Sequence, residues 1–224
     1  MTRIAIGIPS NRGISTPTVQ TILATAKSLE RHGIKTECFF SNANPVDLAR
    51  AIILADALAT TATHLLWLDD DISCPAETIR GMIDADAPAV YVPYALRGLG
   101  GRLDIQLEPG AKPFLRRGQR FMPIALGGLG CALFTRAALE TVIERYPTLR
   151  AYPGTRDRTL PLIFHTSFME LDDGAGNFAM HFVGEDYALA LRLTDSGIKL
   201  LALLGQEVTH AGAMTRVNFP DEAA

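Results

Sequence analysis

The chain has 224 residues, of which 48% are hydrophobic, so one sizeable core and a single domain over residues 1–224 are expected. A formal net charge of -3 gives no overall basic field of the kind that favours non-specific binding to nucleic acids or membranes. The N-terminal apolar run is too short for a signal peptide, and no apolar run reaches the length of a membrane span. Cys38, Cys74 and Cys131 form neither a disulfide framework nor a CxxC metal site, so we expect reduced thiols and a cytoplasmic location.

The first half of the chain alternates strand and helix patterns. The strands are expected at residues 3–9, 34–40, 64–68 and 88–95, and the helices at residues 16–33, 44–62 and 74–86. Thr16 and Asn44 are expected to cap the first two helices, because each precedes a proline that suits the first helical position. The alternation predicts an α/β fold with a mostly parallel central sheet and helices on both faces. Ligands bind such sheets beyond the carboxyl ends of the strands, so residues 9–11 and 69–71 should lie at one site.

The second half is less regular. Residues 95–121 are rich in Gly, Arg and Pro and are expected to form a long irregular or hairpin segment. Residues 121–146 predict a strand, a glycine-rich turn, a second strand and a helix, whereas residues 147–180 carry only weak signals. A further helix and strand follow over residues 184–204, and the polar tail is expected to be mobile at its end.

Three adjacent aspartates follow the apolar strand "HLLWL", although neighbouring carboxylates repel each other. Acidic residues favour the positive end of a helix dipole, and one aspartate could cap the next helix, but this accounts for one or two of them. A divalent cation accounts for more, because Mg²⁺ is commonly held by one or two carboxylates plus substrate phosphates. In an extended chain Asp69 and Asp71 point one way and Asp70 the other, so the triplet could serve a metal and a neighbouring ribose together.

Two further groups could carry chemistry. Glu185 and Asp186 open a helix, where they either follow the ordinary preference for acids in a first turn or supply a general base facing the cleft. His210 follows an apolar strand; a single histidine is more often structural, yet imidazole is an acceptable ligand for a manganese-like ion.

The glycines of "GGLG", residues 127–130, permit a tight turn and close approach by a ligand or by backbone, although a plain hairpin turn explains them too. The chain contains no phosphate-binding GxxxxGK[ST] loop, no dinucleotide-binding GxGxxG and no GxSxG nucleophile elbow. These absences count against a P-loop enzyme, a Rossmann dehydrogenase and a serine hydrolase of the α/β type.

Taken in order, the motifs resemble those of metal-dependent GT-A glycosyltransferases, and those of family 2 most closely. The motifs are "IPSNRG", "DLARAIILADAL", "LLWLDDDI", "GGLGCALFTRAAL", "GEDYALALRLTDSGIKL" and "VTHAG", and they span residues 3–212. The resemblance implies the GT-A fold, a Rossmann-like fold of nucleotide-diphospho-sugar transferases. It also implies a nucleotide-sugar-binding half over about residues 1–95 and an acceptor-side, catalytic half over about residues 96–224.

The resemblance implies a role for each matching residue. Asp69 and Asp71 look like a DxD motif that binds Mn²⁺ or Mg²⁺ through its last acid, with His210 as a third metal contact. Asp186, with Glu185 beside it, looks like the catalytic base of the inverting members. The donor would be held by Pro9, Ser10, Asn11, Arg50, Asp69 and Asp70. The loop near donor and acceptor would contain Gly128, Gly130 and Cys131.

The activity implied is transfer of a hexose-type sugar, with inversion, from a nucleoside-diphosphate sugar to a hydroxyl of a glycan, lipid, protein or nucleic acid. A UDP-sugar is favoured and a GDP-sugar is the other option; Ala51 and Ser41 stand where many members carry an asparagine and an acid, which leaves the base open. A sugar-nucleotide nucleotidyltransferase and a non-catalytic nucleotide- or sugar-binding domain are the alternatives. The basic residues between 97 and 120 form either a solvated loop or a cationic lip for an anionic acceptor.

Overall fold

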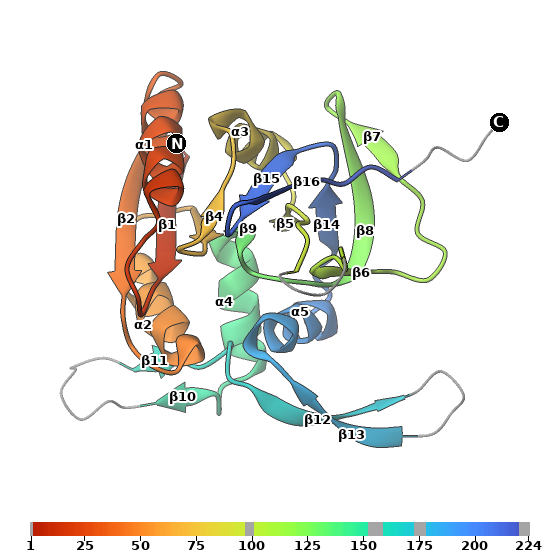
Figure 1. Ribbon diagram of the computed structural model, residues 1–224. Helices are drawn as coiled ribbons and strands as arrows, with labels where there is room; N and C mark the ends of the chain where they lie inside the picture. Colours follow the sequence, from red (N-terminus) through yellow and green to blue (C-terminus); the bar gives the residue numbers. More distant parts are fainter. Residues whose placement is uncertain (1, 97–100, 152–158, 173–177, 220–224) are drawn as a thin grey trace.

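The computed structural model describes residues 2–96, 101–151, 159–172 and 178–219. One mixed sheet runs through its centre in the strand order β2-β1-β3-β9-β5-β14-β8-β6, with β7 paired to β8 (Figure 1). Its strands are β1 (Arg3–Pro9), β2 (Lys35–Ser41), β3 (His64–Leu68), β5 (Ala89–Tyr91), β6 (Ile105–Leu107), β7 (Phe114–Arg116), β8 (Gln119–Gly127), β9 (Cys131–Thr135) and β14 (Leu200–Leu203).

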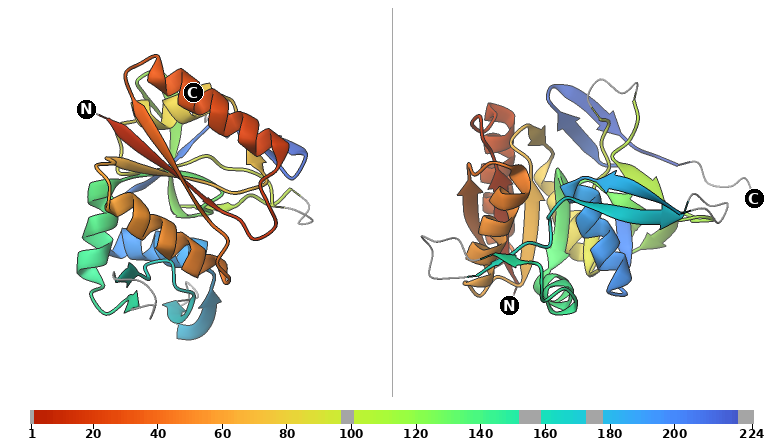
Figure 2. Two further views of the ribbon diagram at one scale, coloured as in Figure 1. Left: turned by 90° about the vertical axis from the view of Figure 1, so that its left-hand side faces the viewer. Right: turned by 90° about the horizontal axis from the view of Figure 1, so that it is seen from below.

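Helices cover both faces of this sheet (Figure 2). One face packs against α1 (Thr16–Glu30) and α3 (Ala76–Asp84), which contribute Ile22, Leu29, Ile79 and Met82 to the core. The other face packs against α2 (Val46–Leu58), α4 (Arg136–Arg145) and α5 (Glu185–Asp195). The predicted α/β fold with helices on both faces of a central sheet is thus confirmed.

The strand directions correct one part of that prediction, because the central sheet is mixed and not mostly parallel. β1 pairs in parallel with β2 and β3, and β14 pairs in parallel with β5. Between these groups β9 runs antiparallel to both β3 and β5, and β8 runs antiparallel to β14. Because β1, β2 and β3 share one direction, their carboxyl ends meet at one edge of the sheet. The Asp69–Asp71 segment leaves β3 at this edge.

Three smaller sheets surround the main one. They pair β4 (Ile72–Ser73) with β15 (Glu207–His210) and β16 (Ala213–Arg216), β10 (Arg150–Ala151) with β11 (Leu160–Pro161), and β12 (Ser167–Asp172) with β13 (Phe178–Val183). The strands β10 to β13 fall where the sequence carried only weak signals. Within the described residues, no helix is both long enough and apolar enough to cross a membrane.

Most of the C-terminal tail is folded onto the body. β15 and β16 form a hairpin whose two-residue turn has positive φ at Ala211 (49°) and Gly212 (89°). β15 also pairs with β4, which brings His210 opposite Ile72. The expected mobile end, residues 220–224, lies outside the described residues.

Two predicted helix caps are wrong. Ser15, not Thr16, caps α1, and its hydroxyl accepts the Thr18 N–H at 3.2 Å. Helix α2 has Pro45 at the capping position and no side-chain cap, and Asn44 precedes this proline through a cis peptide bond.

Candidate active site

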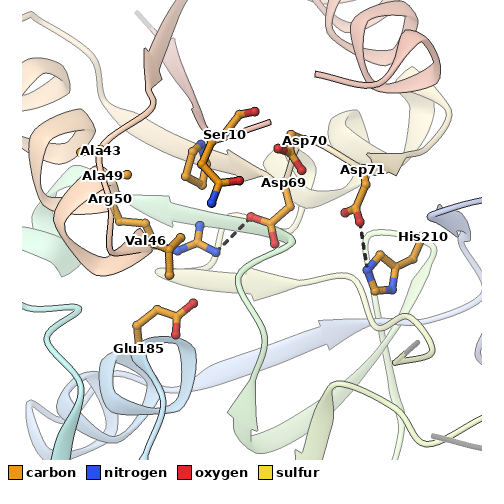
Figure 3. A pocket seen from close by; sticks show the side chains of 12 residues that line it. Ser10, Ala43, Val46, Ala49, Arg50, Asp69, Asp70, Asp71, Glu185 and His210 are labelled. Atoms are coloured by element: carbon orange, nitrogen blue, oxygen red, sulfur yellow. Dashed lines mark hydrogen bonds and ion pairs between the residues drawn. The ribbon is translucent and has the colours of Figure 1, made fainter. Parts of the chain in front are cut away.

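A cavity of about 280 Å³ opens at the carboxyl ends of β1 and β3, and residues from the first turns of α2 and α5 also line it (Figure 3). All eight residues expected to hold donor or metal line this cavity, together with Glu185; they are Pro9, Ser10, Asn11, Arg50, Asp69, Asp70, Asp71 and His210. These residues come from segments far apart in the sequence. They meet beyond the carboxyl ends of the strands, which is where ligands bind α/β sheets.

The backbone of the aspartate segment is held on both sides. The Asp69 N–H donates to the Gly130 carbonyl at 3.0 Å, and the Asp70 carbonyl accepts from the Ser15 N–H at 2.8 Å and the Thr18 hydroxyl at 3.0 Å. The chain turns at Asp70 and Asp71 instead of remaining extended, and all three aspartates line the cavity. The extended backbone expected for this segment is therefore wrong.

Arg50 is a buried cation between two acids. Its side chain is only 2% exposed, and its Nη2 atom lies 3.0 Å from Asp69 Oδ1 and 3.5 Å from Asp186 Oδ1. The guanidinium carbon lies 5.3 Å from the ring centroid of Trp67, within the range of a cation–π interaction. Burial would lower the pKa of Arg50, but Asp69, Asp186 and Glu185 raise it above its ordinary value. The charge of Arg50 is therefore permanent and bridges the two acidic segments.

Asp186 is an acid with a raised pKa. Its side chain is 31% exposed, and burial, opposed by Arg50, raises the pKa of Asp186 to about 7. Glu185 and Asp69 raise this pKa further, and a hydrogen bond from the Leu129 backbone lowers it. An acid with a pKa near neutrality is well matched to accepting a proton at physiological pH. Asp186 is not among the residues that line the cavity, but it is connected to them through Arg50.

His210 and Asp71 face each other on the far side of the cavity. His210 Nδ1 lies 3.0 Å from the Ala95 carbonyl oxygen, which can only accept, so Nδ1 carries the ring proton. In the neutral ring, Nε2 then presents a lone pair, and it lies 3.6 Å from Asp71 Oδ2. The His210 ring also packs edge-on against Tyr94, with centroids 5.0 Å apart. A nitrogen lone pair and a carboxylate oxygen that face each other form a favourable pair of cation ligands.

These residues fit a divalent cation that takes its remaining ligands from a substrate. In the described part of the chain no group of three His, Cys, Asp or Glu side chains converges to hold a metal. The reason at this site is visible: Asp69, expected as a further ligand, is paired with Arg50. Two protein ligands plus phosphate oxygens and water are nevertheless the usual environment of Mg²⁺ in phosphate-handling enzymes.

The glycine-rich loop, residues 127–130, does not line the cavity. The backbones of Gly128 and Gly130 pack against Tyr94 and Asp104, and a Cβ atom at Gly130 would collide with the Tyr94 hydroxyl. Cys131, which was expected in the same loop near donor and acceptor, begins β9 and is fully buried. The Cys131 thiol contacts Cys74 in the core, so its side chain belongs to the packing and does not line the cavity.

Several residues at the site were not anticipated. Ala43, Val46 and Ala49 line the cavity beside Arg50; Ala43 precedes α2, and Val46 and Ala49 belong to its first turn. Asp104 is only 2% exposed, although it follows a segment rich in glycine and arginine whose pattern predicts solvent exposure. A second hollow, of about 510 Å³, shares Ser10 and Asn11 with the first and extends along Phe40, Ser41 and Asn42.

The basic segment lies partly at the end of α3. Arg116 donates to the Asp86 carbonyl at 2.8 Å, while Arg117 donates to the Asp84 carbonyl at 3.1 Å and to the Asp86 carboxylate at 2.9 Å. Arg97 falls outside the described residues. The cationic-lip interpretation thus loses two of its arginines, and for them an ordinary surface role is the better one.

Comparisons with known proteins support the fold and no more. No protein-family model matches the chain, and no curated protein is similar to it in sequence. Among solved structures, A197 from STIV matches over 100% of this chain and 98% of its own, with 17% identity and a TM-score of 0.54. A glycosyltransferase involved in glycosylation of the major capsid of PBCV-1 matches over 61% of this chain and 62% of its own (16% identity, TM-score 0.33). S. aureus TarS 1–349 in complex with UDP-GlcNAc matches over 62% of this chain and 47% of its own (12% identity, TM-score 0.36). The chain therefore has a mixed-sheet α/β fold that is similar, over its whole length, to that of A197 from STIV.

Proposed function

We propose that this protein is a metal-dependent glycosyltransferase that moves a sugar from a nucleoside-diphosphate sugar to an acceptor hydroxyl with inversion. One observation carries the proposal: the Asp71–His210 pair, suited to a cation, lines the cavity, and Arg50 in the same lining contacts Asp186, an acid whose pKa is about 7. A cation at the Asp71–His210 pair would compensate the charge of a diphosphate leaving group. Asp186 would accept the proton that the acceptor hydroxyl loses.

The donor would lie along the cavity with its diphosphate near Asp71 and His210. A Mn²⁺ or Mg²⁺ ion bound there would neutralise charge on the departing diphosphate as a Lewis acid. Ser10 and Asn11 line both hollows, so a nucleotide could pass over them, with its base towards Phe40 and Ser41 and its diphosphate in the cavity. UDP-sugars and GDP-sugars are the donors to test first.

The chain's own acids would handle the proton. As the acceptor oxygen bonds to the anomeric carbon, the bond from that carbon to the diphosphate oxygen breaks, and the hydroxyl proton passes to Asp186 Oδ. Arg50 keeps Asp186 oriented and lowers its pKa, which burial alone would raise further. A positioned base of this kind contributes on the order of 10²–10⁴-fold to the rate.

The test is release of free nucleoside diphosphate from a panel of UDP- and GDP-sugars, with Mn²⁺ or with excess EDTA. The proposal expects metal-dependent release that an acceptor accelerates. Incorporation of labelled pyrophosphate into a sugar nucleotide would instead identify a nucleotidyltransferase. Binding without turnover of any donor would identify a non-catalytic nucleotide-binding domain.

A further inference from the structure

Asp104 is a buried acid that the proposed reaction does not use. It lies just before β6, its carbonyl accepts the Gly128 N–H at 2.9 Å, and its Oδ1 atom accepts the Tyr94 N–H at 2.9 Å. Its own N–H donates to the Tyr94 carbonyl at 3.1 Å. Within the described residues, Oδ2 has no hydrogen-bond partner. Burial, together with the nearby Asp186 and Asp69, raises the pKa of Asp104 well above its usual range, although the Tyr94 N–H opposes this rise.

The free side of Asp104 faces the loop formed by residues 128–130. A Cβ atom at Gly128 would lie 2.9 Å from Asp104 Oδ2 and 3.2 Å from the Tyr94 hydroxyl oxygen. At Gly130 it would collide with the same hydroxyl. Only a backbone without side chains at these two positions can pack this closely, so Asp104 and Tyr94 form a surface against which the loop rests.

The opposite side of the same loop contacts both acidic segments of the site. The Leu129 backbone hydrogen-bonds to Asp186, and the Gly130 carbonyl accepts the Asp69 N–H at 3.0 Å. Three consecutive residues therefore lie between the buried pair Asp104–Tyr94 and the two acids that Arg50 bridges. A shift of the loop would change both contacts together.

We propose that Asp104 is a positioning residue: with Tyr94 it supports residues 128–130 from behind and thereby keeps the Leu129 N–H on Asp186. The Asp104 side chain suits this role, since its Oδ2 atom fills the space under Gly128. The proposal rests on the proposed function only in treating Asp186 as the base. The support itself is a property of the resting protein and is measured without substrate.

The test is the pKa of Asp186, followed by carbon-13 NMR of aspartate carboxyls and assigned by loss of the signal in Asp186→Asn. In Asp104→Ala the loop loses its support, and Asp186 loses the hydrogen bond from the Leu129 N–H. Because this hydrogen bond lowers the pKa of Asp186, its loss should raise that pKa. The other charged or titratable groups around Asp186 are kept in this variant, namely Arg50, Asp69, Glu185, Tyr91, Tyr94 and Tyr187. In Asp104→Asn, which keeps the shape of the carboxyl group, the pKa of Asp186 should stay near its wild-type value.

The direction of the shift decides the outcome. If Asp104 were merely a nearby negative charge, its removal would lower the pKa of Asp186, and a fall or no change in Asp104→Ala overturns the proposal. Should that variant fail to fold, Gly128→Ala displaces the loop from the same contact and should give the same rise. Thr78→Ala is the control, because Thr78 is equally buried but hydrogen-bonds to Gln206, away from the loop. A rise of the same size in the pKa of Asp186 in Thr78→Ala would show a general effect of lost stability and would also overturn the proposal.

The two proposals can fail separately. If the wild type releases no nucleoside diphosphate from any donor while Asp104→Ala raises the pKa of Asp186, the proposed activity fails and the support stands. If the wild type turns over but the pKa of Asp186 does not rise in either loop variant, the activity stands and the support fails.

Discussion

His210 Nε2 and Asp71 Oδ2 lie 3.6 Å apart, and the bond from His210 Nδ1–H to the Ala95 carbonyl fixes which nitrogen faces the acid. This geometry follows from the pairing of β15 with β4, which joins the C-terminal tail to the aspartate segment. Because an orienting carbonyl behind a metal-binding histidine is a common arrangement, the pair is where we expect the cation to bind.

Asp71→Asn should therefore reduce turnover by about 10²-fold or more and weaken donor binding in Mn²⁺, since a neutral amide compensates less of the diphosphate charge. His210→Ala should act in the same direction but less strongly, because water can replace one neutral ligand. Steady-state kinetics at several Mn²⁺ concentrations measure both effects. Asp84→Asn, which removes a half-exposed acid paired with Arg80, is the matched control. Full activity in Asp71→Asn, or undiminished wild-type turnover in excess EDTA, would refute the metal site.

The pKa of Asp186, about 7, predicts a pH profile. The base must be deprotonated to act, so kcat/KM should rise with pH and level off above about 7. In Asp186→Asn the rate should fall by about 10²-fold or more, and the remaining activity should lack this limb of the profile. Rates measured between pH 5 and 9 with saturating Mn²⁺ test this; an unchanged limb in the variant would assign the titration to another group.

The titration of Asp186 should also affect the free energy of unfolding, which should fall with rising pH while kcat/KM rises. The pKa of Asp186 in the folded protein lies above its unfolded value of about 3.9, so between about pH 4 and 7 the folded state retains a proton that the unfolded state has released. Its contribution to stability is present below about pH 4 and is lost as pH rises through about 7. Urea unfolding across this range should show the loss in the wild type and not in Asp186→Asn. Equal pH dependence in both proteins would contradict the raised pKa.

Arg50→Met should destabilise the protein by about 3–5 kcal/mol, because it leaves Asp69 and Asp186 partly buried without their shared cation. Combining it with Asp69→Asn should recover part of the loss. A double-mutant cycle by urea denaturation measures this coupling. Additive losses would mean that the 3.0 Å contact between Arg50 and Asp69 contributes little to the fold.

The β15–β16 hairpin should become more protected when ligand binds. It carries His210, and its turn at Ala211 and Gly212 lies next to Asp71, whose carbonyl accepts the Ala211 N–H at 2.9 Å. Hydrogen exchange over residues 211–216 is expected to slow when nucleoside diphosphate and Mn²⁺ are added together. The same exchange rates with and without ligand would count against closure of this segment over the donor.

Local patterns predicted the first half of the fold and the place of the site. Apolar periodicity and turn residues mark β1, α1, β2, α2 and β3, and the rule that ligands bind at strand ends brings Asn11 and Asp69 together. The insertion of β9 between β3 and β5 could not be predicted, because pairing between strands distant in sequence leaves no trace in periodicity. Nor could the turn that brings Asp70 into the cavity, since it depends on hydrogen bonds from Ser15 and Thr18.

Buried charge was the main feature hidden from the sequence. Arg50 lies in a helix with apolar residues on all sides, which hints at burial but not at a bridge between Asp69 and Asp186. Asp104 gave no signal at all, because its burial results from the way β6 folds back along β8. Both positions depend on tertiary packing, which local propensity does not encode.

The most direct test of the account is calorimetry of UDP and GDP with Mn²⁺ on the wild type, Asp71→Asn and Asp186→Asn. We expect metal-dependent binding to the wild type, nearly unchanged affinity in Asp186→Asn, and strongly reduced affinity in Asp71→Asn, because Asp71, and not Asp186, is assigned to the cation. Loss of nucleotide binding in Asp186→Asn as severe as in Asp71→Asn, or binding to the wild type that is indifferent to Mn²⁺, would contradict the division between a cation-binding acid and a catalytic base.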